Sequence, residues 1–171
     1  AAHGADILAM RDAILAGRIG RVERISVRAS WPRTASYYQR NDWAGSLRRG
    51  ERWVLDGPAN NALAHQLTNM LVLAGPEPNV FATPTAVRGE LYIAGPHASH
   101  DTAFIEIATA EGPTLHWMGT HAAETWFGPT IEVRGERGSI EWSMRQGGVI
   151  RTPEGEEEVP YDFDAHARMV E

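Results

Sequence analysis

Hydrophobic and polar positions near the N-terminus predict one helix followed by one strand. In "ADILAMRDAILA", residues 5–16, Ile7, Met10 and Ile14 recur at helical spacing. In "VERISVRASW", residues 22–31, apolar and polar residues alternate, which predicts a strand with one covered face. The apolar positions are Ile25, Val27, Ala29 and Trp31, and the polar positions are Arg24, Ser26, Arg28 and Ser30.

A second helix is predicted in the middle of the chain. In "GPANNALAHQLTNMLVLAG", Pro58 suits a first helical turn and Gly75 ends the pattern. One side of this helix is apolar and should face a core. Its members are Leu63, Leu67, Met70, Leu71 and Ala74.

From residue 79 onward the pattern predicts a succession of strands. Six short alternating stretches are separated by turn signals such as "AEGP" and "RQGG". So many strands in sequence predict a large, mostly antiparallel sheet, and the two helices should pack on one of its faces, which gives an α+β fold. We expect "PEGEEEVP" (153–160) to be a solvated hairpin tip and residues 32–57 to be a long irregular, functional segment.

Polar side chains interrupt the second helix. At 100° per residue, Asn61, His65 and Thr68 share an arc of about 60°. This stripe contains no charged residue, and neutral hydrogen-bonding groups favour a partly buried site over open water. A neutral imidazole can give or take a proton near neutral pH, and an amide one turn earlier can orient it or bind a ligand. We therefore predict that His65 and Asn61 are catalytic; the alternative is that both are satisfied polar residues of the core.

The segment "WPRTASYYQRNDWAG" is rich in aromatic and hydrogen-bonding side chains. Aromatic rings stack on sugar faces or nicotinamide-like rings, and arginine binds hydroxyls and carboxylates. The other interpretation is a loop held together by its own aromatic residues. The substrate-binding candidates are Trp31, Arg33, Tyr37, Tyr38, Arg40 and Trp43, with Asn60, Thr68 and His121 from other segments.

Composition narrows the chemistry. The net charge of −6 disfavours a nucleic-acid partner. All sixteen basic residues are arginine, so any lysine acid or base must come from another segment. The chain has no cysteine and only scattered carboxylates, so we predict no metal site, although His97 and His100 are spaced as some metal ligands are. No apolar run approaches ~20 residues and no signal-peptide pattern is present, so we expect no membrane association and a cytoplasmic location.

Several motifs together resemble the glucose–fructose oxidoreductase/inositol dehydrogenase (Gfo/Idh/MocA) family. The resemblance extends from about residue 7 to about residue 165 and covers the second half of such an enzyme. One departure is Asn61, where many family members have aspartate; another is Thr68, again in place of aspartate. The motifs are Trp31-Pro32-Arg33, Tyr37-Tyr38, Trp43-Ala44-Gly45, Asp56 through His65, and Asn69 through Gly75.

The resemblance implies a domain organisation and a reaction. Residues 1–171 would be a single C-terminal substrate-binding and oligomerisation domain, like that of glyceraldehyde-3-phosphate dehydrogenase, without the N-terminal Rossmann domain that binds NAD or NADP. The full-length protein would transfer hydride between a sugar, polyol or related carbonyl compound and the nicotinamide, with His65 as the proton-transfer residue and Asn61 beside it. The fragment alone would be inactive. Its partners would be its own Rossmann domain, the substrate and further copies bound through the sheet face.

Two other functions remain compatible with the sequence. One is a non-catalytic sugar sensor or scaffold on the same fold, favoured by Asn61, because an amide cannot ionise as a carboxylate does. The other is a stand-alone carbohydrate-binding or lipid-carrying domain, which would rest on the aromatic segment. The last residues, 162–171, look like the entry to one more element.

Overall fold

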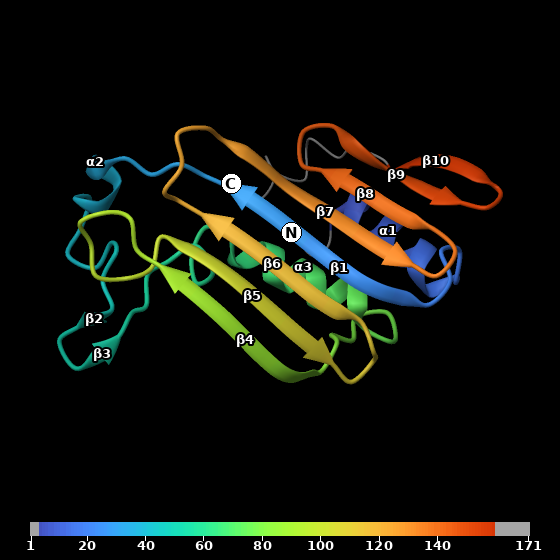
Figure 1. The fold of residues 1–171 in the computed structure, drawn as a ribbon, viewed down its shortest axis with the longest axis horizontal. Coiled ribbons are helices and arrows are strands. Elements are labelled where there is room, and N and C mark those ends of the chain that lie inside the picture. Colours follow the sequence, from blue (N-terminus) through green and yellow to red (C-terminus); the bar gives the residue numbers. More distant parts are fainter. Residues whose placement is uncertain (1–3, 160–171) are drawn as a thin grey trace.

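Strand β1 lies at the centre of an eight-stranded sheet in the computed structural model, which describes residues 4–159 (Figure 1). The strand order is β10-β9-β8-β7-β1-β6-β5-β4, and β2 and β3 form a separate small hairpin. The elements are α1 (Ala5–Leu15), β1 (Val22–Ser30), α2 (Ala35–Tyr38), β2 (Arg48–Arg49), β3 (Arg52–Trp53), α3 (Ala64–Ala74), β4 (Pro84–Tyr92), β5 (Thr102–Thr109), β6 (Thr114–Thr120), β7 (Phe127–Gly135), β8 (Ser139–Ser143), β9 (Gly147–Thr152) and β10 (Gly155–Val159).

The sheet is antiparallel except at one pair. β1 pairs in parallel with β6, with Ile25 opposite Leu115 and Val27 opposite Trp117. On its other side β1 pairs antiparallel with β7, and every remaining pair of the large sheet is antiparallel. The predicted α+β class with a mostly antiparallel sheet is therefore confirmed.

One face of the sheet is covered by the two long helices and the other is open. Figure 1 shows α1 and α3 behind the sheet. Ile25 and Val27 of β1 are buried on the covered face, and Met70 of α3 is fully buried with them. The alternate residues Arg24 and Arg28 keep solvent exposure on the open face. The sequence alternation in β1 thus reports the two faces correctly, because successive side chains of a strand point to opposite sides.

The helix boundaries agree with the sequence at α1 and differ at α3. Gly17 follows α1 with a φ of 69°, as a C-terminal cap requires. By contrast, α3 begins at Ala64 and not near Pro58, and residues 58–63 form successive turns. Asparagine side chains compete with the backbone for hydrogen bonds, and here the side chain of Asn61 bonds outside the helix. The 100° helical spacing therefore does not apply to Asn61.

Two other segments contain more regular structure than expected. The end of "PEGEEEVP" pairs with β9 as the edge strand β10, although most of its side chains are exposed as a hairpin tip would be. The segment 32–57 contains the short helix α2 and the β2–β3 hairpin. Because both are built from few residues with weak periodicity, their patterns are hard to recognise in a sequence. The expected element in 162–171 lies outside the described residues.

Irregular segments gather at one end of the sheet. The C-terminal ends of β1, β4 and β6 meet there, at the left of Figure 1, together with α2 and the β2–β3 hairpin. Candidate residues from distant parts of the sequence come together at this end. No helix among residues 4–159 has the length and apolar character needed to cross a membrane.

Candidate functional site

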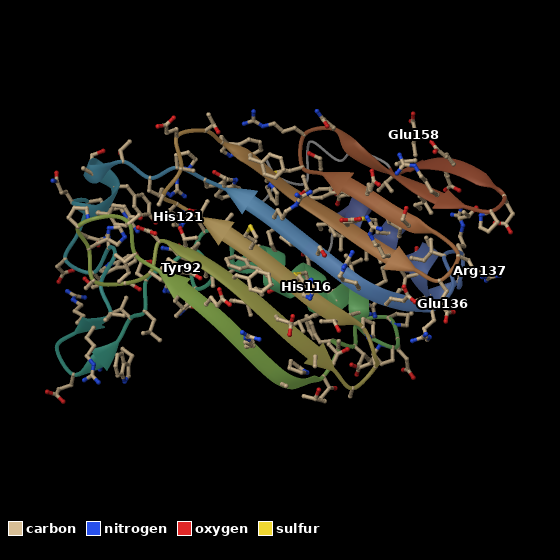
Figure 2. The ribbon with its side chains drawn as sticks, in the orientation of Figure 1. Tyr92, His116, His121, Glu136, Arg137 and Glu158 are labelled. Atoms are coloured by element: carbon tan, nitrogen blue, oxygen red, sulfur yellow. The ribbon has the colours of Figure 1, made fainter. Side chains whose placement is uncertain are left out.

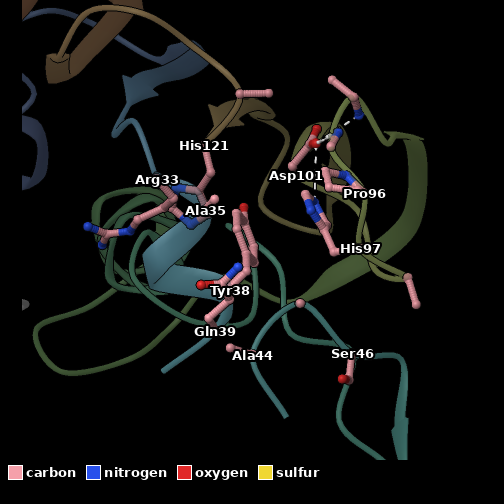
Figure 3. Close-up of a pocket in the computed structure, with 15 residues that line it drawn as sticks. Arg33, Ala35, Tyr38, Gln39, Ala44, Ser46, Pro96, His97, Asp101 and His121 are labelled. Carbon is pink, nitrogen blue, oxygen red and sulfur yellow. Dashed lines mark hydrogen bonds and ion pairs between the residues drawn. The ribbon is translucent and has the colours of Figure 1, made fainter. Parts of the chain in front are cut away.

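A pocket of about 480 Å³ opens at the loop end of the sheet (Figure 3). Its wall comes from the segment after β1, from the turn before the β2–β3 hairpin, from the loop 94–101 and from the end of β6. The side chains that could contact a ligand there are Arg33, Tyr38, Gln39, Ser46, His97, Asp101 and His121.

Asp101 holds one wall of the pocket in place. Its side chain is 1% exposed, and Oδ2 accepts hydrogen bonds from the backbone N–H groups of Ala94 (2.7 Å) and Gly95 (2.9 Å). The Nε2 atom of His97 lies 3.2 Å from the same oxygen, and its ring stacks on Tyr38 with centroids 4.1 Å apart. Loop 94–101 is thus tied both to the start of β5 and to α2.

His121 presents a neutral imidazole. Its Nδ1 lies 2.8 Å from the carbonyl oxygen of Trp31, which can only accept, so Nδ1 carries the proton. Burial lowers the pKa of His121, and the Trp31 carbonyl opposes this only in part. Nε2 therefore bears a lone pair, and in the part of the chain that the structure describes it has no hydrogen-bond partner. This atom is itself buried, so a ligand hydroxyl group can donate a hydrogen bond to it only when the pocket wall shifts.

Tyr38 contributes a protonated phenol. Burial, and then the negative charge of Asp101, raise its pKa to about 12. Its hydroxyl therefore stays neutral and can donate or accept a hydrogen bond near neutral pH. With the neutral His121, it gives the pocket uncharged polar groups beside the single cation, Arg33.

The predicted catalytic pair lies next to this pocket and not in its wall. Asn61 is half-buried at the entry to α3, where its Nδ2 donates to Asp56 Oδ1 (2.6 Å) and approaches the Tyr37 hydroxyl (3.3 Å). His65 is exposed on α3. Asp56 Oδ2 in turn accepts from the N–H of Gly45 (2.8 Å), a residue of the pocket wall. A continuous polar connection therefore joins Asn61 to the pocket.

The polar stripe on α3 differs from the expectation. His65 and Thr68 face solvent, so the stripe is not a partly buried site in this chain. The buried polar residues of α3 are instead Gln66 and Asn69, which bond to each other at 3.3 Å. The sequence could not distinguish the exposed pair from the buried pair, because both consist of polar residues without a formal charge, three positions apart.

The other substrate-binding candidates fall into two groups. Arg33, Tyr38 and His121 line the pocket, and Tyr37 and Trp31 support it through Asn61 and His121 respectively. The guanidinium of Arg40 packs on Tyr37, 3.6 Å from its ring centroid. The candidates outside the pocket wall are therefore Trp31, Tyr37, Arg40, Trp43, Asn60 and Thr68.

Four of the seven side chains that could contact a ligand were not predicted to bind substrate. Gln39 lies in the aromatic segment and Ser46 directly follows it, but neither carries a distinctive sequence signal. The sequence indicated His97 only as a possible metal ligand. Asp101 is an isolated carboxylate before a strand, and no pattern marked it as part of a site. Their roles depend on contacts across the fold, which sequence spacing does not report.

The open face of the sheet carries a second, shallower hollow of about 650 Å³. Figure 2 shows His116 on β6 at this face. Its Nε2 lies 3.3 Å from a carboxylate oxygen of Glu106 on the neighbouring strand, and Arg24 and Arg134 complete much of the lining. This hollow is lined mostly by charged side chains, unlike the loop pocket.

Comparison with known proteins identifies the domain. The model of the GFO/IDH/MocA C-terminal domain matches residues 7–141. No curated protein matches the chain in sequence.

Solved structures share the fold at low sequence identity. The WlbA dehydrogenase from Bordetella pertussis, in complex with NADH and UDP-GlcNAcA, superposes with a TM-score of 0.70 at 21% identity and covers 83% of this chain and 41% of its own. UDP-N-acetylglucosamine 3-dehydrogenase GnnA from Acidithiobacillus ferrooxidans superposes with a TM-score of 0.69 at 14% identity, and the match covers 99% of this chain and 47% of that enzyme. A levoglucosan dehydrogenase in complex with NADH superposes with a TM-score of 0.67 at 19% identity, and the match covers 94% of this chain and 45% of that enzyme.

These similarities show the fold, and they show that the chain spans less than half the length of each of these three enzymes. The family match covers most of the chain, and it agrees with the open-faced sheet and with the motifs in the segments around the pocket. The chain belongs to the GFO/IDH/MocA oxidoreductase family, as a C-terminal domain.

Proposed function

We propose that this chain is the substrate-binding and oligomerisation domain of an NAD(P)-dependent oxidoreductase that acts on a sugar, a polyol or a related carbonyl compound. The observation that carries the proposal is the pocket at the loop end, connected through Asp56 to the segment that bears Asn61 and His65. Family membership supplies the reaction class.

The chemistry of the pocket suits a polyhydroxylated ligand. Tyr38 and His121 are neutral and can exchange hydrogen bonds with hydroxyl groups, and the aromatic ring of Tyr38 can face a sugar ring. Arg33 adds a permanent cation that can bind hydroxyls or a carboxylate. Structural neighbours that carry a nucleotide sugar or act on levoglucosan support the same class of ligand.

His65 is assigned the proton-transfer role. It stands exposed on α3, where a further domain could cover it, and it follows Asn61 by four residues in the sequence. The nicotinamide accepts or donates the hydride when bound. Residues 4–159 contain no dinucleotide-binding fold, so NAD or NADP would be held mainly by an N-terminal Rossmann domain. Neighbours in complex with NADH support the use of a nicotinamide cofactor.

The full-length protein provides the test. Reduction of NAD or NADP should be followed by nicotinamide absorbance with myo-inositol, D-glucose and levoglucosan as the panel. His65→Ala should lower turnover by about 10²–10⁴-fold, since a positioned acid or base contributes that much. Arg21→Ala, at the exposed ion pair with Glu136 and outside both hollows, is the control and should leave turnover unchanged. Failure of the full-length protein to bind either nicotinamide would contradict the proposal, and the isolated chain should be inactive.

A non-catalytic sugar sensor is the second candidate, and Asn61 favours it. An amide cannot ionise, so it supports an imidazolium less well than the aspartate of many relatives would. In a sensor, His65→Ala would leave ligand-dependent behaviour intact, and no panel compound would be oxidised.

Assembly through the open sheet face belongs to the same proposal. No helix covers this face among the described residues, and its hollow is lined by side chains of both charge signs. These charges can pair with opposite charges on a second copy of the chain. Sedimentation of the full-length protein should show an oligomer, and Arg134→Glu should weaken it. A monomer at micromolar concentration would contradict this role.

A further inference from the structure

Asp56 and Asn61 form a carboxylate–amide pair just before α3. Asp56 is buried, and its two oxygens have different partners: Oδ1 accepts from Asn61 Nδ2 at 2.6 Å and Oδ2 accepts from the Gly45 N–H at 2.8 Å. The same Nδ2 approaches the Tyr37 hydroxyl at 3.3 Å. The pair therefore joins three separate segments at the edge of the pocket.

The carboxylate determines which way the amide faces. An ionised carboxylate only accepts hydrogen bonds, so turning the amide over would place two acceptor oxygens at the present 2.6 Å contact. The amino group must therefore face Asp56. Asn61 Oδ1 has no donor among residues 4–159 and remains a free acceptor.

We propose that Asp56 is a positioning residue that locks the Asn61 amide and so keeps Oδ1 available to accept a hydrogen bond in the substrate site. Under the proposed function, on which this last part rests, the donor is a hydroxyl group of the sugar or polyol. The pair also accounts for the departure from aspartate at Asn61. A second carboxylate there would face Asp56 at hydrogen-bond distance, and like charges that close disfavour each other.

A reciprocal exchange of the two residues tests the pairing. Asp56→Asn loses one of two charge-assisted hydrogen bonds, and Asn61→Asp opposes two carboxylates, so each should lower the melting temperature by about 3–10 °C. The double variant D56N/N61D restores one donor and one acceptor at each contact and should recover at least half of the summed loss. Asp42→Asn, at an exposed carboxylate 2.8 Å from Arg49, is the matched control and should change it by about 2 °C or less.

The amide itself reports the hydrogen bond to Asp56 directly. In ¹H–¹⁵N spectra of the wild-type chain, the Asn61 side-chain amide should show one strongly downfield proton that exchanges slowly with water. Acidification should remove this shift with the same midpoint as the carboxyl carbon of Asp56. This titration uses the wild type, so it decides the question even where Asp56→Asn does not fold.

Activity adds a third measurement in the full-length protein. With the compound of the panel that is turned over fastest, Asp56→Asn should lower kcat/KM by about 10-fold, the effect of one misplaced hydrogen bond, and the reciprocal exchange should restore part of it. Two results would overturn the inference. One is an Asn61 amide signal that does not change as Asp56 titrates. The other is a double variant whose loss of melting temperature equals or exceeds the summed losses of the two single variants. Neither readout needs substrate or cofactor, so failure of the oxidoreductase proposal would leave both intact and would be recognised separately.

Discussion

The covered core of the sheet and the loop end are held together by different forces. In the core, Ile25, Leu115 and Met70 are fully buried and meet other apolar side chains. At the loop end, the buried carboxylates of Asp56 and Asp101 accept hydrogen bonds from backbone N–H groups of two loops. Apolar packing is tolerant of small changes in direction, whereas hydrogen bonds need defined geometry. The difference shows that the region proposed to bind substrate is fixed by polar contacts on a scaffold fixed by apolar ones.

Removal of Asp101 should produce the largest effect. Asp101→Ala leaves the N–H groups of Ala94 and Gly95 without their acceptor and removes the carboxylate beside His97, which should lower the free energy of unfolding by about 3–5 kcal/mol. Denaturant unfolding measures the loss, and hydrogen exchange should show protection lost first in loop 94–101. Uniform loss across the sheet would break the comparison between the two regions.

A core truncation should have a similar or slightly smaller cost and a different distribution. Met70→Ala deletes a fully buried side chain and should cost about 2–5 kcal/mol through lost transfer energy and the cavity that remains. Hydrogen exchange should accelerate in α3 and in β1 together, with loop 94–101 following only through global unfolding. Preferential opening of that loop would contradict the assignment of Met70 to the core.

Two glycines offer a matched pair that isolates packing at the pocket. Gly45 and Gly50 both have φ near 60° (68° and 58°), but a Cβ at Gly45 would lie 2.8 Å from the Tyr38 ring and 2.9 Å from His97, while Gly50 has open space. Gly45→Ala should cost about 2–4 kcal/mol and Gly50→Ala only about 1 kcal/mol, the strain of the left-handed backbone. Equal losses in the two variants would mean that Tyr38 and His97 move aside at no cost in free energy, and would contradict tight packing at the pocket wall.

The smallest effect should be a pH dependence confined to the loop end. Burial lowers the pKa of both His100 and His121, so below the ordinary value of about 6.5 the unfolded chain binds more protons than the folded one. The contribution of these two neutral rings to the free energy of unfolding should therefore be fully present above about pH 6.5. It should be lost as the pH falls through their two lowered pKa values. Urea unfolding at several pH values measures this dependence. A stability that rises on acidification through this range would be incompatible with buried neutral rings.

Sequence patterns predicted the scaffold well and the site only in part. The alternation in β1 and the spacing in α1 correspond to real faces, because long periodic segments leave little choice of structure. The start of α3 was placed too early, since the side chain of Asn61 bonds to Asp56 and not along the helix. The partners of Asp101 and His97 could not be predicted, as they join residues whose proximity depends on the ends of three strands.

The sequence by itself determined the fold class, the family and the chemical types present at the loop end, because periodicity and long motifs are properties of the chain. Only the tertiary structure decided that Arg33, Tyr38 and His121 share a pocket while His65 remains outside it on an exposed helix face. It also decided that a carboxylate stands beside Asn61. Burial, hydrogen-bond partners and the pKa shifts that follow from them arise only when distant segments meet, and no spacing along the chain records them.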